Sequence, residues 1–480
     1  MVFFAGLVIL GFMAIDTGFT QLNSWVPTGS MSTARYGHTA TILLNGKVLI
    51  IGGYASSGGT QTAELYDPAS GLFESVGMTL FQHGGLCTAT LLLDGRVLIA
   101  GGGTAQMSAE IYNPATGSFT ETGQMSYRHY GHTATRLLDG RVLIAGGSRS
   151  GDDTGGCPIT QQFCEIFNPA SETFAPANPL NQDRSSHTAT LLDDGHILIT
   201  GGGHSILEAP CTGAPWNSAE LYNPDSGIFT LMPENMQYAR VGHTATKLAN
   251  GKVLIIGGHI YASYAELYDP ESATFSPTGL VNVCRTDHTA TLLLNGQILI
   301  AGGRFWEDST ELITNSAEIY DPTNGLFTLT GNMTGPRRMH SAALLPNGRV
   351  LVVGGIAIPF YALTTAELYL APSTPEDLVE QITSEITTLP GSSEISLTIQ
   401  LDTAMSKLQE ARTFLKAGNL QLAKLRYCQS IGKVRDFIWN VQQKVPALIS
   451  PETGQMLIAQ TEALIDLIEK EMEDAGLTPC

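Results

Sequence analysis

Short apolar runs alternate with glycine-centred turns along most of this chain, in a pattern that repeats. The most regular piece reads GHTATILLNGKVLIIGG at 37–53 and GHTATKLANGKVLIIGG at 242–258, and related copies occur seven times. We call the residue after the opening glycine of the copy at 37–53, and its counterpart in every other copy, the first position of the repeat. The first positions are His38, Cys87, His132, His187, His243, His288 and His340. In every copy the first glycine of the closing pair lies 14 residues after this position. A repeat of this length indicates a solenoid or a propeller rather than one irregular core.

A second repeated segment follows each double glycine, as in AELYDP at 63–68 and AEIYDP at 317–322. The distance from its glutamate to the next first position is always 22 or 23 residues. The distance from the first glycine of the pair to the glutamate ranges from 9 to 19. Variation in length is therefore confined to one connection per repeat. The seven glutamates are Glu64, Glu110, Glu165, Glu220, Glu266, Glu318 and Glu367.

Each repeat predicts four short strands. Asn-Gly or Asp-Gly stands between two apolar runs in all seven copies, as at Asn45-Gly46, which predicts a tight hairpin with a two-residue type I′ turn. The run after it, such as Val48 to Ile51, lacks alternation and predicts a strand buried on both faces. The glutamate segment gives a third strand, Asp-Pro or Asn-Pro a turn, and a following phenylalanine the fourth strand. Four strands per repeat, covered on both sides by like units, describe a propeller blade.

These segments resemble the kelch-repeat family, through the double glycine after an apolar strand, the Glu-x-Tyr-Asp-Pro segment and the aromatic residue that follows. The resemblance covers residues 32–370 and implies a mainly β fold, a seven-bladed β-propeller of the galactose oxidase-like kind. It says little about function, because one fold hosts many activities.

The seventh repeat has no Asp-Pro turn and no aromatic strand after AELYL at 366–370. The missing piece is found at the other end, where WVPTGSM within 19–31 matches FTETGQM at 119–125. We therefore expect residues 19–31 to complete the last blade and close the ring, so that the propeller occupies residues 19–371.

After residue 371 the period changes to that of helices, which predicts a small all-α bundle over 372–480. A proline-containing helix start stands at Thr374-Pro375, and apolar residues then recur at spacings of three and four. Through GNLQLAKLRYCQSIGKVRDFIWNVQ at 418–442, this part resembles a small helical domain found at the C-termini of secreted bacterial and archaeal proteins.

Charge excludes some partners. With 25 Lys and Arg against 44 Asp and Glu the net charge is −19, which disfavours nucleic acid and anionic membrane surfaces. The uncharged run from Val2 to Ile15 is too short to span a bilayer but has the length of a signal-peptide core. We expect residues 1–18 to be an apolar leader or signal peptide and the protein to be secreted or attached to the cell surface.

The seven cysteines form no Cys-x-x-Cys pair, which argues against a zinc ribbon or a thioredoxin-type site. Cys157 and Cys211 occupy similar positions in the variable connections of adjacent repeats, and we expect a disulfide between them in an exported protein. The other cysteines are predicted to be small buried residues, except Cys480 at the terminus.

The variable connections are the candidate binding surface, because in a propeller they share one face with the loops that link blades. Aromatic residues in these connections suit a sugar or a protein, and the alternative is that they fold down over the blade edges. The candidates are Trp216, Phe305, Trp306, Phe360 and Tyr361.

Arginine stands three residues before the first position in five repeats, with Gly84 and His129 in the other two. One interpretation is a ring of guanidinium groups at the channel mouth that binds a carboxylate or phosphate. The favoured one is structural, because each repeat also has its glutamate. The five arginines are Arg35, Arg184, Arg240, Arg285 and Arg337.

No cofactor is expected. The six repeated histidines would be spread around a ring and cannot converge on a metal, which leaves His83, His129, His204 and His259 as weaker ligand candidates. Copper, as in galactose oxidase, is disfavoured because no tyrosine and histidine pair stands on distinct loops, and Asp152-Asp153 is only a weak calcium candidate. The best carboxylate pair for a glycosidase is Asp287 with Glu307 or Asp308.

These observations predict an extracellular propeller that acts as a non-catalytic binding scaffold through its variable face, with a protein or glycan of the cell exterior as partner. The alternative is a secreted carbohydrate-active or galactose oxidase-like enzyme that uses the same face.

Overall fold

The computed structural model describes most of the predicted propeller and part of the C-terminal region. The described residues are 23–371 without 57, 105, 150–158, 204–213, 259–262, 308–309 and 359–360, and then 403–414, 419–448, 465, 468, 472, 475, 477 and 478. They fall into two compact units, one of which is Leu22–Pro372.

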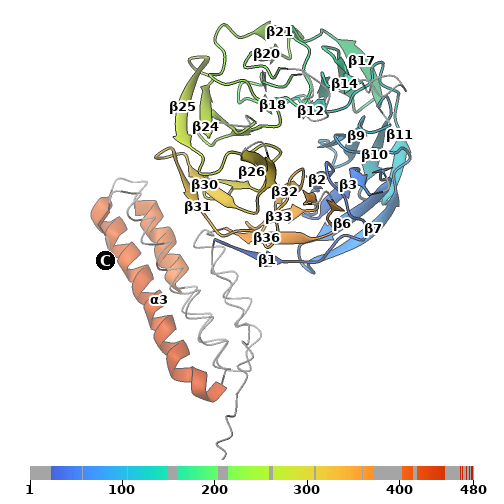
Figure 1. Cartoon of the computed structure of the whole chain (residues 1–480). Helices are drawn as coiled ribbons and strands as arrows, with labels where there is room; N and C mark the ends of the chain where they lie inside the picture. Colours follow the sequence, from blue (N-terminus) through green and yellow to red (C-terminus); the bar gives the residue numbers. More distant parts are fainter. Residues whose placement is uncertain are drawn as a thin grey trace, which may run out of the picture. The chain divides into compact units, whose positions relative to one another are not determined.

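The described residues of the first unit form seven four-stranded antiparallel sheets, which are arranged in a ring (Figure 1). Blades 1 to 3, from the innermost strand outward, are β2 (Thr39–Ile42), β3 (Val48–Ile51), β6 (Thr62–Asp67) and β7 (Leu72–Met78); β8 (Thr88–Leu91), β9 (Val97–Ala100), β10 (Ala109–Asn113) and β11 (Ser118–Glu121); β12 (Thr133–Arg136), β13 (Val142–Ala145), β16 (Cys164–Asn168) and β17 (Thr173–Ala177). Blades 4 and 5 are β18 (Thr188–Leu191), β19 (Ile197–Thr200), β20 (Ala219–Asn223) and β21 (Ile228–Leu231); β22 (Thr244–Lys247), β23 (Val253–Ile256), β24 (Tyr264–Asp269) and β25 (Thr274–Leu280). Blades 6 and 7 are β26 (Thr289–Leu292), β27 (Ile298–Ala301), β30 (Ala317–Asp321) and β31 (Leu326–Leu329); β32 (Ser341–Leu344), β33 (Val350–Val353), β36 (Ala366–Leu370) and β1 (Ser24–Pro27).

The N-terminal strand closes the ring, as predicted. Strand β1 pairs antiparallel with β36, with Trp25 opposite Tyr369. The Trp25 indole takes the place that phenylalanine holds in the other blades, and its Nε1 donates to the carbonyl of Gly331 in blade 6 at 2.7 Å. On the other side, the Gly29 N–H donates to the carbonyl of Gly71 in blade 1 at 2.9 Å.

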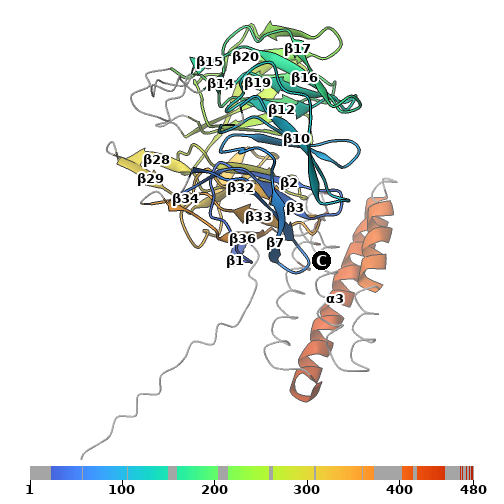
Figure 2. The ribbon, with the colours of Figure 1, turned by 90° about the vertical axis from the view of Figure 1, so that its right-hand side faces the viewer.

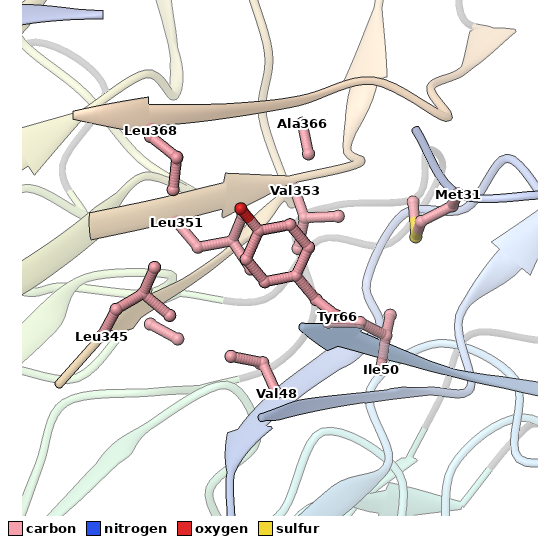
Figure 3. Packing of buried hydrophobic residues seen from close by; sticks show 10 residues of the cluster. Met31, Val48, Ile50, Tyr66, Leu345, Leu351, Val353, Ala366 and Leu368 are labelled. Carbon is pink, nitrogen blue, oxygen red and sulfur yellow. The ribbon is translucent and has the colours of Figure 1, made fainter. Parts of the chain in front are cut away.

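The core lies between the blades rather than inside any one of them. Each second strand is buried along its whole length and sends alternate side chains to opposite neighbours, so that Val48 and Ile50 pack toward blade 7 while Leu49 and Ile51 pack toward blade 2. Figure 3 shows the contact of blades 7 and 1, where Tyr66 lies among buried aliphatic side chains. This arrangement explains the absence of alternation in these strands.

The hairpin between the first two strands of each blade is present, but the predicted type I′ turn is wrong. In the hairpin of blade 1, Gly46 has a positive φ of 80° but Asn45 does not, and the Gly46 N–H donates to Leu43 O at 2.9 Å. The Leu43 N–H in turn donates to Lys47 O, so the loop has three residues, a turn over Leu44 and Asn45 followed by a left-handed glycine. The Asn45 carboxamide oxygen accepts from the Lys47 N–H at 3.1 Å, which favours this longer loop.

The double glycine permits close approach of neighbouring blades. Gly52 has φ 71°, and a Cβ there would lie 2.6 Å from the carbonyl oxygen of His83 and 2.7 Å from Cys87 Sγ. A side chain at this position is therefore excluded both by conformation and by space.

In the second unit, residues 403–414 and α3 (Leu420–Leu448) are helical. Leu408 of the first segment and Tyr427 and Ile431 of α3 are buried, and Ser430 Oγ donates to Ala404 O at 2.9 Å. The predicted helical part is thus present, whereas its first predicted helix lies outside the described residues. Within the described residues, every helix is too short or too polar to cross a membrane.

Candidate binding face of the propeller

The face that carries the links between blades also carries four short extra hairpins, and we call it the loop face. The hairpins extend the variable connections of blades 1, 3, 6 and 7, and Figure 2 shows β14–β15 and β28–β29 on the same side of the ring. They are β4 (Tyr54–Ala55) with β5 (Gly58–Gly59), β14 (Ser148–Arg149) with β15 (Ile159–Thr160), β28 (Arg304–Glu307) with β29 (Thr310–Ile313), and β34 (Ile356–Ala357) with β35 (Tyr361–Ala362).

The five repeated arginines are buried in a clasp that is the same in each of their blades. In blade 6, Arg285 Nη1 donates to the Gly302 carbonyl at 2.8 Å and Nη2 pairs with Glu318 at 2.6 Å. Glu318 also accepts from the backbone N–H groups of Asn282 and Val283, in the link from the preceding blade. Burial lowers the pKa of the Arg285 guanidinium, and the Glu318 carboxylate opposes that effect. Equivalent pairs join Arg35 to Glu64, Arg184 to Glu220, Arg240 to Glu266 and Arg337 to Glu367.

Histidine replaces arginine in blades 2 and 3. His83 Nδ1 lies 2.8 Å from the Gly101 carbonyl and its Nε2 lies 2.8 Å from Glu110. His129 lies in the same way between Gly146 O and Glu165. The repeat spacing predicts that Gly84 takes the place of the arginine in blade 2. His83, one residue earlier in the chain, takes that place instead. Both histidines therefore serve as internal links, and their contacts are not those of metal ligands.

These contacts match the structural interpretation of the arginines. None of the five reaches the channel mouth with a free guanidinium, since their side chains are at most 1% exposed and bound to glutamate and carbonyl oxygens. The clasp ties each incoming link to the double glycine of its own blade, which explains why the arginine, the glycine and the glutamate recur together.

Replacing Arg285 by methionine should lower the free energy of unfolding by about 3–5 kcal/mol, because Glu318 would keep a buried charge without a cation. Urea unfolding followed by tryptophan fluorescence measures the loss. The variant Arg285→His is the matched control, since it copies blade 3 and should lose less. Equal losses in the two variants, or a loss below about 1 kcal/mol in the first, would contradict this assignment.

The repeated histidines join neighbouring blades. His132, His187, His243, His288 and His340 each place Nε2 at 3.0–3.1 Å from the threonine hydroxyl that begins the innermost strand of the preceding blade. Burial lowers the pKa of all five histidines. With the added effect of the Arg184 charge, the pKa of His187 falls to about 3. These histidines are therefore neutral at pH 7. In the part of the chain that the structure describes, no three His, Cys, Asp or Glu side chains gather as metal ligands. The absence of a cofactor remains a prediction.

A closed circle of backbone hydrogen bonds surrounds the axis at the loop face. The residue before each first position donates its N–H to the carbonyl of its counterpart in the preceding blade, at 2.8–3.3 Å. All of them have a positive φ, between 51° and 64°, which is strained for Leu86 and Met339. We call this set the axial ring; its members are Gly37, Leu86, Gly131, Ser186, Gly242, Asp287 and Met339.

Four charged side chains gather beside the axial ring on blades 6 and 7. Arg304 Nε pairs with Asp287 Oδ2 at 2.8 Å, and its Nη1 pairs with Glu311 at 3.0 Å. Arg338 Nε pairs with Glu311 at 3.1 Å and lies 3.7 Å from Asp287 through Nη1. We call these residues the charge quartet. The side chains of Arg304 and Arg338 are only 6% and 12% exposed, so the quartet is an internal network beside the axial ring.

The predicted aromatic residues are distributed over separate blades. Trp306 lies next to the charge quartet, with the Arg304 guanidinium 4.8 Å from its ring centre. Trp216, on blade 4, is half-buried and donates Nε1 to the Asp183 carbonyl at 3.0 Å. Tyr361 is 51% exposed, Phe305 is half-buried, and Phe360 lies outside the described residues. No ring contact in the described part joins Trp216 to Trp306.

Other candidates have different outcomes. Asp287, expected to pair with Glu307 or Asp308 in a glycosidase, instead binds two arginines, and Asp308 lies outside the described residues. Cys157, Cys211, Asp152-Asp153, His204 and His259 also lie outside them. Cys87 and Cys164 are buried, as expected, and burial raises the pKa of each thiol to about 12. Cys428 is disulfide-bonded, which corrects its interpretation as a free buried residue.

Arg304, Glu311 and Arg338 were not found from the sequence, although a signal for two of them was present. Arg304 follows the double glycine at a position that is Tyr54 in blade 1 and Ser148 in blade 3. Arg338 precedes its first position by two residues, where blades 1 and 3 have tyrosine. A charge that breaks the repeat marks a position that the fold itself does not require.

Comparison with known proteins identifies the architecture. A scan against models of protein families finds no match, and a search of curated proteins finds none either. Among solved structures, a fungal alcohol oxidase of the AA5 family in complex with copper is similar, with 16% identity and a TM-score of 0.58 over 73% of this chain and 77% of that chain. The chain has a galactose oxidase-like propeller fold. A second similar structure, YjhT, has 12% identity and a TM-score of 0.48 over 70% of this chain and 95% of that chain.

Proposed function

We propose that the protein is an extracellular binding scaffold whose loop face takes a protein or glycan. The observation that carries the proposal is the confinement of irregular features to that face. The opposite face repeats the same three-residue hairpin in every blade, whereas the loop face has the extra hairpins, the charge quartet and Trp306. Variable loops on a rigid closed ring are a common basis for recognition.

The location outside the cell rests on two supports. The uncharged run at residues 2–15 has the length of a signal-peptide core, and the disulfide at Cys428 suits an oxidising compartment. Secretion of a tagged full chain, compared with a chain that lacks residues 1–18, tests this part.

A glycan array probed with the full chain, with captured proteins identified by mass spectrometry in parallel, tests the binding role. Trp306→Ala and Tyr361→Ala should reduce binding at least tenfold, because both side chains lie on the loop face. Leu44→Ser, at an exposed hairpin tip of the opposite face, is the matched control and should leave binding unchanged. Equal effects of loop-face and control variants would refute the proposal.

The alternative is an oxidase or carbohydrate-active enzyme at the same face, and the fold shared with a copper alcohol oxidase favours it. The repeated histidines of this chain are engaged between blades, and the carboxylates of the quartet are bound to arginine, which supports the binding role instead. Stoichiometric copper in the purified protein, with hydrogen peroxide release from a primary alcohol, would reverse the preference.

A further inference from the structure

The charge quartet leaves one nitrogen of each arginine, Nη2, unused by the described residues. Nε and Nη1 of Arg304 bind Asp287 and Glu311. Arg338 Nε faces Glu311, and its Nη1 lies 3.7 Å from Asp287 and donates to Met339 Sδ at 3.3 Å. Among the described residues, no hydrogen bond or ion pair reaches Nη2 of either arginine. Two nearly buried guanidinium groups thus keep donors that the fold does not use.

Asp287 and Glu311 hold these arginines in place and leave the N–H groups of Nη2 available. Asp287 is fixed by the axial ring, and Glu311 lies opposite Trp306 in the β28–β29 hairpin. Trp306 also lies against the Arg304 guanidinium, which limits its rotation. Arginines oriented in this way lose little side-chain entropy when they bind an anion.

The charges of the quartet balance, because Asp287 and Glu311 offset Arg304 and Arg338. Burial, followed by the charge of Arg304, lowers the pKa of Arg338, and the two carboxylates oppose that effect. A ligand carboxylate would therefore be held by charge-assisted hydrogen bonds from the two Nη2 groups rather than by an excess of positive charge.

We propose that the Nη2 groups of Arg304 and Arg338 bind the carboxylate of an acidic sugar, a uronic acid residue. This inference rests on the proposed binding role of the loop face and names its ligand class. The sugar is favoured over a peptide because the backbone groups of the axial ring already bind one another, leaving no strand edge there for a peptide backbone. Trp306, whose ring lies against the Arg304 guanidinium, suits the apolar face of a sugar ring.

Isothermal titration of the full chain with glucuronate and galacturonate tests the proposal, with glucose, galactose, acetate and sulfate as comparison ligands. We expect saturable binding of at least one uronate, at least tenfold tighter than acetate, sulfate or either neutral sugar, and weaker at high salt. Absence of uronate binding would overturn the proposal, and so would equal affinity for sulfate, which would indicate a general anion site.

Variants locate the site. Arg338→Lys keeps the charge but not the planar fork, and should weaken uronate binding at least tenfold. The double variant Arg338→Gln with Glu311→Gln keeps the quartet neutral and should abolish binding while the melting temperature shows that the chain still folds. Arg128→Gln, on an exposed link of the same face, is the control and should bind normally. Normal binding by both Arg338 variants would overturn the assignment, whereas binding of neutral glycans or proteins through Trp306 would preserve the proposed function alone.

Discussion

Lowering the pH from 7 to 5 is expected to remove several kcal/mol of the free energy of unfolding of the propeller. Burial, followed by the charge of a nearby arginine, lowers the pKa of His38, His187 and His243 from 6.5 to about 3. In the unfolded chain these histidines take up protons below about pH 6.5, whereas in the folded chain they do so only near pH 3. Stability from this source is complete above pH 6.5 and is lost as the pH falls toward 3.

The magnitude is large because the histidines act together. At pH 5 the unfolded chain binds protons at these histidines and the folded chain does not. This lowers the free energy of unfolding by about 2 kcal/mol for each of the three histidines, against a typical total of about 5–15 kcal/mol. Urea unfolding at pH 7, 6 and 5 measures the slope of stability against pH. His243→Gln, which keeps a polar partner for the Thr188 hydroxyl, should reduce the slope by about one proton. His196→Gln, beside a hairpin tip where the side chain is half-buried and paired with Asp194, is the control. An unchanged slope in both variants would rule out the explanation.

Deleting residues 19–31 is expected to lower the melting temperature by roughly 10 °C or more. The deletion removes β1 from blade 7, exposes the edge of β36 and removes the hydrogen bonds of this segment to Gly331 in blade 6 and Gly71 in blade 1. Differential scanning calorimetry of the two chains measures the shift. Deletion of residues 1–18 alone is the control for shortening and should leave the transition unchanged.

A point variant separates closure from chain length. Trp25→Ala keeps the strand but removes a side chain that is only 9% exposed, its hydrogen bond to Gly331 O and its contact with Tyr369. We expect a loss of about 3–5 kcal/mol, as for other large buried aromatic residues. An unchanged melting temperature in both the deletion and Trp25→Ala would mean that the ring does not depend on its last strand.

The sequence predicts this fold well because every blade depends on the same packing. The unbroken apolar run at Val48 to Ile51 is possible only for a strand covered on both sides, and the match of WVPTGSM to outer strands predicts the closure. The turn type was missed because Asn-Gly is compatible with a two-residue loop and with a longer one. The choice depends on the hydrogen bond from the Lys47 N–H to the Asn45 side chain.

The candidate site was predicted only in part. Residues that recur in each blade can be recognised as structural from their spacing, whereas residues that occur in one blade alone have no such signal. The arginine, glycine and glutamate of the clasp could be interpreted from their period alone. His83 was missed because one residue of shift separates it from the repeat register. The charge quartet was missed because Asp287, Arg304 and Arg338 meet through the packing of two blades, which spacing along the chain does not show.

The axial ring also affects the electrostatic field near the axis of the propeller. The seven hydrogen bonds run in one direction around the axis, each N–H toward the preceding blade and each accepting carbonyl toward the following one, so the dipoles of these groups form a circle. Dipoles in a closed circle largely cancel, in contrast to the end of a helix, where aligned dipoles attract a counterion. The hydrogen bonds of the axial ring therefore add little attraction for an incoming solute. Any preference for a positive or a negative solute there comes instead from the few side chains that interrupt the symmetry.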